Sequence, residues 1–136
     1  MKIVMAFGSF DLLHKGHIYY LNESKKYGDK LIVVVARDSN IIRFKGKSPL
    51  HNEINRVKQL KKLSIADKVI LGNKGNIFEI LTKIKPDVIC LGYDQKPIDK
   101  EIKKELKIRN INAKIVRINS YKPKIYKSSK LKSKSK

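Results

Sequence analysis

The turn between the first apolar run and the first helical segment constrains the fold most strongly. Residues 3–7 form an apolar run that predicts a buried strand, and residues 18–28 predict a helix closed by a glycine. Residues 8–17 between them read GSFDLLHKGH. In an open parallel sheet, ligands bind at such a turn, beyond the carboxyl end of a strand. The unpaired N–H groups and the dipole of the following helix would favour a phosphate there.

Two histidines in this turn, His14 and His17, are separated by three positions, and Gly16 lies between them. If the helix begins near Gly16, both imidazoles can reach one anion at its N-terminus. Gly16 has no Cβ, so a phosphate could approach the backbone closely. Taken singly, each residue has a plainer explanation as a cap, a turn residue or, for Phe10, part of the core. The combination at this place is much more specific than its parts.

The rest of the chain alternates between strand and helix patterns. Further strands are predicted at residues 30–36, 67–71, 88–91 and 113–118. Helices are predicted at residues 38–44, 52–63, 76–84 and 97–109. Within residues 52–63, we expect Ile54, Val57, Leu60 and Leu63 to form the buried face. The alternation predicts an α/β fold: a Rossmann-like, doubly wound parallel sheet in a single domain.

The charge of the chain is strongly positive, with 32 basic and 12 acidic residues and a net charge of +20. Such a chain attracts nucleotides, nucleic acid or an acidic membrane surface. Seven of the lysines lie in residues 121–136, so we expect a domain over residues 1–131 and a basic, disordered tail over residues 132–136. No apolar run is long enough to cross a membrane, and the single cysteine, Cys90, suits a cytoplasmic protein.

The segment at residues 8–17 resembles the Gly-Thr-Phe-Asp and His-x-Gly-His signatures of the cytidylyltransferase-like nucleotidyltransferase family, with Ser9 at the threonine position. The resemblance extends over nearly the whole chain. Within that family, residues 35–38 (VARD), 92–95 (GYDQ) and 126–129 (YKSS) look most like the archaeal FAD synthases. The glycerol-3-phosphate cytidylyltransferases are the close alternative.

The resemblance implies a transfer of a nucleotidyl group to a substrate phosphate, with release of pyrophosphate. An FAD synthase would join AMP from ATP to FMN, whereas the alternative would make CDP-glycerol from CTP and glycerol 3-phosphate. An attacking phosphate is already anionic near neutral pH, so no strong general base is needed. Catalysis would rest on positioning and on stabilising the charge of the phosphate oxygens.

The resemblance also implies the site residues. The catalytic contacts with phosphate oxygens would come from His14, His17, Lys45 and Lys47. Nucleotide-binding residues are expected at Gly8, Ser9, Phe10, Asp11, His14, Lys15, Gly16, His17, Arg56, Gly92, Asp94, Tyr121, Ser128 and Ser129. The arginine that opens the family's last motif is not evident, and Lys122 or Lys124 would take its place. An apolar wall for a flavin ring is expected from Phe7, Phe10, Phe44 or Tyr121.

A divalent cation, magnesium, would bridge the triphosphate, held more by phosphate oxygens and water than by the protein. Asp11 is the nearest acid, and the plainer expectation for it is a turn residue that fixes the loop. The family resemblance implies a homodimer that binds a nucleotide and a phosphorylated acceptor, with no role for a membrane. A non-catalytic nucleic-acid-binding protein is the remaining alternative, and the intact histidine pair argues against it, because nucleic-acid binding needs no such pair.

Overall fold

The sheet has five parallel strands. A computed structural model describes residues 1–92 and 99–119 of the chain. The strands are β1 (Ile3–Gly8), β2 (Lys30–Val35), β3 (Lys68–Leu71), β4 (Val88–Leu91) and β5 (Lys114–Arg117). Their order in the sheet is β3-β2-β1-β4-β5, and every neighbouring pair is parallel. The prediction of a doubly wound parallel sheet is therefore confirmed.

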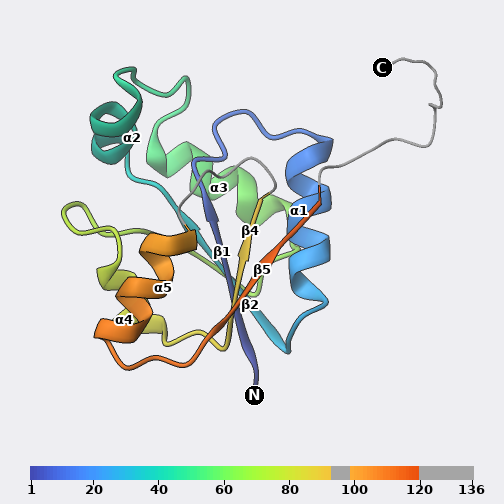
Figure 1. The fold of residues 1–136 in the computed structure, drawn as a ribbon. Helices are drawn as coiled ribbons and strands as arrows, with labels where there is room; N and C mark the ends of the chain where they lie inside the picture. The colour runs from blue at the N-terminus through green and yellow to red at the C-terminus, as the bar shows by residue number, and fades with distance from the viewer. Residues whose placement is uncertain (93–98, 120–136) are drawn as a thin grey trace, which may run out of the picture.

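The helices cover both faces of the sheet. They are α1 (Lys15–Lys25), α2 (Asp38–Lys45), α3 (Glu53–Leu63), α4 (Glu79–Ile84) and α5 (Asp99–Ile108). Figure 1 shows α1 and α3 on one face, α4 and α5 on the other, and α2 beyond the carboxyl ends of the strands. Among the described residues, no helix combines the length and the apolar content needed to span a bilayer.

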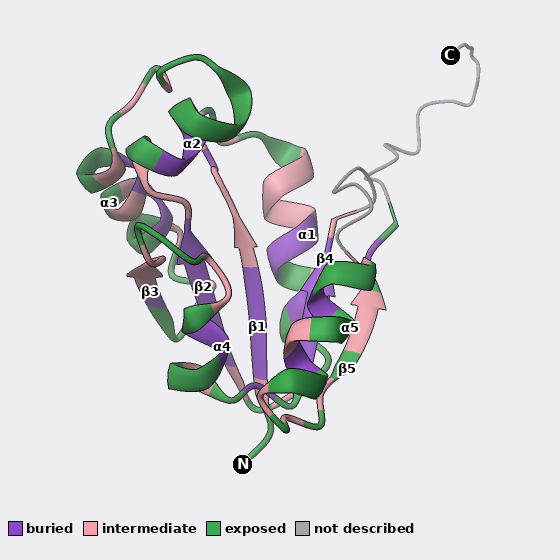
Figure 2. Cartoon of the chain, turned by 60° about the vertical axis from the view of Figure 1, so that its left-hand side comes forward, coloured by how far each residue is buried: buried purple, intermediate pink, exposed green. Residues whose placement is uncertain are grey.

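The central strands are buried on both faces, as their β-branched sequences predict. Val33 and Val35 pack with Leu21 of α1 and Leu60 of α3. Val34, the residue between them, belongs to the opposite core, which α4 and α5 supply. Figure 2 shows this central burial in purple. The two cores hold the carboxyl ends of β1, β2 and β4 in fixed positions at one edge of the sheet.

Two helices differ from the sequence prediction. In α3 the fully buried side chains are Arg56 and Leu60, while Ile54 is 54% exposed, so the prediction that Ile54 faces the core was wrong. The helix α4 begins at Glu79, three residues later than predicted. The reason is local: the Asn76 side chain accepts the N–H of Phe78 at 2.9 Å and forms a turn ahead of the helix.

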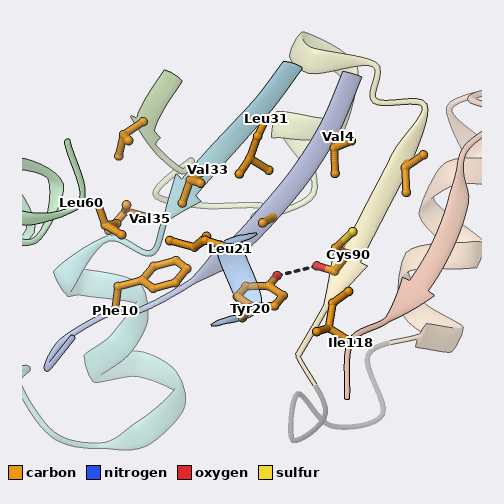
Figure 3. Close-up of a cluster of buried hydrophobic side chains, with 13 residues drawn as sticks. Val4, Phe10, Tyr20, Leu21, Leu31, Val33, Val35, Leu60, Cys90 and Ile118 are labelled. Atoms are coloured by element: carbon orange, nitrogen blue, oxygen red, sulfur yellow. Dashed lines mark hydrogen bonds between the residues drawn. The ribbon is translucent and has the colours of Figure 1, made fainter. Parts of the chain in front are cut away.

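The strands β1 and β4 separate at their carboxyl ends, and Tyr20 of α1 occupies the gap. The register of the two strands ends at the pair Ala6 and Cys90. Beyond it, the Tyr20 hydroxyl donates to the Cys90 carbonyl oxygen at 2.5 Å (Figure 3). The same hydroxyl accepts the N–H of Phe7 at 3.3 Å. Burial raises the pKa of Tyr20, so its hydroxyl stays protonated as a donor. This split marks the switch point of the doubly wound sheet, where such folds bind ligands.

Candidate active site

The turn from β1 to α1 is built over the buried ring of Phe10. Phe10 has φ 52°, in the left-handed region that a bulky residue rarely adopts, and its side chain is buried. Its ring lies 5.4 Å from the His17 ring, centroid to centroid, and next to Tyr20 (Figure 3). A Cβ on Gly8 would stand 3.2 Å from the Phe10 ring, so glycine gives this ring room to fold back under the turn. Phe10 therefore supports the histidines from below.

His14 and His17 cap the first turn of α1 reciprocally. His14 is the N-cap residue, and its Nδ1 accepts the N–H of Gly16 at 3.0 Å. The Nδ1 of His17 accepts the N–H of His14 at 3.3 Å. This is the arrangement of a capping box with imidazoles in place of the usual side chains. Because both Nδ1 atoms accept hydrogen bonds, the neutral rings carry their protons on Nε2. The rings lie 4.0 Å apart, so two Nε2–H donors stand together at the helix N-terminus.

Gly16 has a packing reason as well as the one that the sequence suggested. A Cβ at this position would lie 2.8 Å from Cε1 and 3.0 Å from Nδ1 of His14. Since real Cβ atoms essentially never come that close, any other residue would displace the His14 ring from its capping position. The glycine between the histidines is therefore needed for the first of them to cap the helix.

A pocket of about 700 Å³ opens over the carboxyl ends of the strands. It gathers a set of the predicted site residues: Gly8, Ser9, Phe10, His14, Gly16, His17, Lys45 and Gly92. Their elements are the β1–α1 turn, the end of α2 and the residue after β4. This size suits an organic ligand that is largely enclosed.

The three predicted lysines differ in their positions. Lys45 lies at the end of α2 and lines the pocket, with its Nζ 3.5 Å from the Ser9 hydroxyl oxygen. Lys47 is exposed in the loop after α2 and does not line the pocket in this structure. Lys15 is the first residue of α1 and is also exposed outside the pocket wall. Of the three, only Lys45 lines the pocket.

Asp11 holds the loop that follows α2. Its two carboxylate oxygens accept the N–H groups of Leu50 at 2.8 Å and His51 at 2.9 Å. Burial by itself raises the pKa of Asp11. The two hydrogen bonds and the nearby charges of His51 and Arg56 together lower the pKa by more than burial raises it, so the pKa of Asp11 lies below its usual value. The carboxylate is thus engaged with backbone donors. Among residues 1–92 and 99–119, no group of three acidic, histidine or cysteine side chains could hold a metal ion.

Arg56 lies beneath the site. The family resemblance had implied instead that it contacts the nucleotide. Its side chain is fully buried. Its Nη1 donates to the carbonyl oxygens of Ser9 at 2.7 Å and Ala36 at 2.8 Å. Its Nε donates to the His51 carbonyl at 3.0 Å, and its Nη2 to the Asp38 carboxylate at 2.5 Å. Arg56 therefore ties the ends of β1 and β2 to α2, and it does not line the pocket.

The helix α2 is joined to the loop after β3 by side chains that sequence reasoning did not single out. The donors recur every three residues, at Arg37, Asn40 and Arg43. They bond the carbonyl oxygens of Gly72, Asn73 and Gly75 at 2.8, 2.7 and 3.0 Å, respectively. In the sequence, only the recurrence of a polar residue at every third position could have indicated these contacts. Their acceptors lie more than 30 positions away in the chain.

Four predicted site residues lie outside the described residues: Asp94, Tyr121, Ser128 and Ser129. Gly92, the last described residue before the first gap, lines the pocket, and its carbonyl oxygen accepts Nη1 of Arg117 at 2.6 Å.

Comparison with known proteins agrees with this geometry. The cytidylyltransferase-like family matches residues 5–134. The FAD synthase of Thermoplasma volcanium is 46% identical over 131 residues, which cover 96% of this chain and 92% of that protein. A crystal structure from Thermoplasma volcanium GSS1, described as a lipopolysaccharide core biosynthesis protein, is 48% identical with a TM-score of 0.84, covering 90% of this chain and 99% of that one.

A more distant likeness concerns the fold alone. The pantoate-beta-alanine ligase of Francisella tularensis superposes with a TM-score of 0.65 at 17% identity, covering 90% of this chain and 60% of that one. The parallel sheet, the histidine turn at its switch point and the family match over nearly the full chain agree with one another. The chain belongs to the cytidylyltransferase-like family.

Proposed function

We propose that this chain is an FAD synthase, an FMN adenylyltransferase that transfers AMP from ATP to FMN and releases pyrophosphate. The observation that carries the proposal is the 46% sequence identity to the FAD synthase of Thermoplasma volcanium, which extends over 96% of this chain. The paired Nε2–H donors at the start of α1 support it, because they stand where a phosphate would be bound. The large pocket gives room for a nucleotide and a second ring system.

The chemistry is a single in-line displacement. An oxygen of the FMN phosphate attacks the α-phosphorus of ATP and forms the new P–O bond. The bond from that phosphorus to the oxygen bridging to the β-phosphate breaks, and pyrophosphate leaves with the electron pair. His14 and His17 donate from Nε2 to phosphate oxygens whose charge grows in the transition state. Lys45 and the Ser9 hydroxyl complete the phosphate site from the α2 side.

The divalent cation belongs with the triphosphate. Magnesium keeps much of its water and is bound through substrate phosphates in many sites, so it needs few protein ligands. The described residues offer no ready cage for it, and the Asp11 oxygens already accept backbone N–H groups. The cation would offset phosphate charge, and we assign no side chain to hold it.

We propose the following roles for the remaining predicted residues. Asp94 accepts from the sugar or base of the nucleotide, Tyr121 packs on a ring, and Ser128 and Ser129 donate hydroxyl groups to phosphate. Lys47 approaches the phosphates from the loop after α2. For Arg56 we replace the expected nucleotide contact with a positioning role, because its side chain donates to carbonyl oxygens at the strand ends and does not line the pocket.

The assembly we propose is a homodimer of one-domain subunits, with the domain over residues 1–131 and a basic tail beyond it. Exposed apolar side chains support an association: Leu50 is 75% exposed and Ile54 is 54% exposed. The free, buried thiol of Cys90 suits the reducing cytoplasm that we propose as its location. Sedimentation velocity at micromolar concentration tests the dimer, and a monomer there would overturn it.

The function is tested by offering both acceptor pairs to the purified protein with magnesium. FMN and ATP should release pyrophosphate and yield FAD, identified by chromatography and flavin fluorescence. CTP and glycerol 3-phosphate should release no more pyrophosphate than a protein-free control. Pyrophosphate release from the second pair alone would replace FAD synthase with glycerol-3-phosphate cytidylyltransferase.

A further inference from the structure

The face of α2 that lines the pocket carries an exposed aromatic ring. Four residues of this helix line the pocket: Asn40, Ile41, Phe44 and Lys45. Residues 40 and 41 lie one helical turn before residues 44 and 45, so the four share one face of the helix. Asn40 and Ile41 are buried, whereas Phe44 is 65% exposed. A ligand in the pocket can therefore reach the ring of Phe44.

The other phenylalanine rings of the pocket are used by the fold. Phe10 is buried in the core that α1 and α3 supply. Phe7 and Phe78 are partly buried and pack against the opposite core. The ring of Phe44 belongs to neither of these two cores of the described residues. It therefore contributes little to the packing of the domain and is left as a surface for a ligand.

The guanidinium group of Arg43 covers the Phe44 ring from outside the pocket. Its carbon atom lies 4.8 Å from the ring centroid, within the range of a cation–π contact. Its Nη2 donates to the Gly75 carbonyl oxygen at 3.0 Å, which ties the guanidinium to the loop after β3. Because Arg43 itself does not line the pocket, it restrains the ring on one face and leaves the other face to the pocket.

The next residue, Lys45, belongs to the proposed phosphate site. Its Nζ lies 3.5 Å from the Ser9 hydroxyl oxygen, and both residues line the same pocket as Phe44. A ligand whose phosphate lies at the histidine turn therefore shares this pocket with the Phe44 ring. A phenyl ring has no hydrogen-bonding group, so it recognises the flat or apolar part of such a ligand and not its phosphate.

We propose that Phe44, restrained by Arg43, stacks on the flat heteroaromatic ring of a phosphate-bearing substrate. The proposal rests on the proposed function, in which ATP brings an adenine ring and FMN brings an isoalloxazine ring. Either ring offers the π-face on which a phenyl ring packs. Phe44 is then a binding residue that acts on one substrate through its ring and leaves the phosphate chemistry unchanged.

The test measures kcat, the KM for FMN at saturating ATP and the KM for ATP at saturating FMN. Phe44→Leu keeps an apolar side chain and removes the ring. It should raise the KM for one substrate by about 5- to 50-fold and leave the other KM and kcat within about twofold of wild type. A rise for FMN alone identifies the isoalloxazine ring as the partner of Phe44, and a rise for ATP alone identifies adenine.

Two further variants separate stacking from a general disturbance of α2. Phe44→Tyr keeps a stacking ring and should leave both KM values within about threefold of wild type. Arg43→Met removes the cation from the ring and should raise the KM for the same substrate as Phe44→Leu, by about 2- to 5-fold. Tyr27→Leu is the matched control, because Tyr27 is an exposed aromatic residue outside the pocket wall, and it should change neither KM.

Three results would overturn the proposal. They are unchanged KM values for both substrates in Phe44→Leu, equal rises for both substrates, and a Phe44→Tyr variant that is as impaired as Phe44→Leu. Failure of the proposed function looks different, because the wild type would then make no FAD from FMN and ATP at all.

Discussion

We propose two roles for each histidine of the β1–α1 turn, one for each of its two ring nitrogens. The Nδ1 atoms of His14 and His17 accept backbone N–H groups and so shape the first turn of α1. In the proposed mechanism, the Nε2 atoms carry the protons that are shared with phosphate oxygens. This division makes the structural and the chemical contributions separable by mutation.

Asparagine at either histidine position should separate them. The side-chain oxygen of asparagine can accept the capping N–H in place of Nδ1, but its amide nitrogen is too close to the backbone to donate from the position of Nε2. We expect His14→Asn and His17→Asn each to lower kcat for FAD formation by about 10²- to 10³-fold. The free energy of unfolding, measured with urea, should change by less than about 1 kcal/mol. Near wild-type turnover in both variants would remove the histidines from the mechanism.

Asp11 should make the stability of the loop after α2 dependent on pH. Its pKa is lower in the folded protein than in the unfolded chain, so its contribution is present above the unfolded pKa. The contribution is lost as the pH falls through the folded pKa. We expect Asp11→Asn to be less stable than wild type by about 1 kcal/mol near pH 7.

The difference between Asp11→Asn and wild type should begin to shrink as the pH falls through the unfolded carboxyl pKa of about 3.9, and it should reach zero only below the lower pKa that Asp11 has in the folded protein. Urea unfolding across the pH range measures it. A difference that stays constant down to acid pH would show that the charge of Asp11 is not what holds the loop.

Among the helices, strands and turns, the sequence predicted those features that depend on residues close together in the chain. The β1–α1 turn was found because strand, glycines and histidines are contiguous. In α3, a period of three placed Ile54 inside, whereas the buried pair is Arg56 and Leu60, four residues apart as on one helix face. The family resemblance implied a nucleotide contact for Arg56, and only the fold shows the carbonyl oxygens to which it donates.

The α2 contacts could not be predicted from local pattern. Asn40 is a polar residue beside a buried isoleucine, and by itself it suggests nothing but a helix surface. Its partner, the Asn73 carbonyl, lies 33 residues away and meets it only because β2 and β3 pair in a particular register. Sites that depend on the packing of distant elements require the folded structure.

The Tyr20 hydroxyl, which bridges the separated ends of β1 and β4, should contribute to the stability of the fold. Tyr20→Phe removes the donor to the Cys90 carbonyl and an acceptor of the Phe7 N–H in a buried site. We expect a loss of about 1–3 kcal/mol in the free energy of unfolding, measured with urea. Tyr27→Phe is the control, because Tyr27 is 40% exposed, and it should stay within about 0.5 kcal/mol of wild type. Equal stability of the two variants would mean that the Tyr20 hydroxyl does not hold the strand ends.

At the scale of the whole molecule, the positive charge is spread well beyond the site. Residues 121–136 contain seven of the lysines, and the rest of the chain still carries +13. A charge of this size raises the affinity for any polyanion and makes it dependent on salt, whether or not catalysis takes place. Net charge therefore does not distinguish an enzyme from a nucleic-acid-binding protein. A measurement of catalytic turnover distinguishes the two.

Two truncations test where the functional chain ends. Deleting residues 132–136 removes three lysines and none of the proposed site residues, so FAD formation should stay within about twofold of wild type. Deleting residues 121–136 also removes Ser128 and Ser129, and we expect FAD formation to fall by at least about 10²-fold. Steady-state rates at saturating ATP and FMN measure both. Equal activity of the two truncated proteins would place the last segment outside the site.

Following the α-phosphorus of ATP shows whether the protein transfers AMP to FMN and whether the histidine turn takes part. ATP radiolabelled at the α-phosphorus is incubated with FMN, magnesium and either wild-type protein or His17→Asn, and the products are separated by chromatography. With wild type the label should move into FAD while the pyrophosphate stays unlabelled, and with His17→Asn the transfer should be slower by about 10²-fold or more. Label that stays in ATP with wild type would mean that the protein does not transfer AMP to FMN, and label that reaches FAD equally fast with both proteins would mean that His17 takes no part in the transfer.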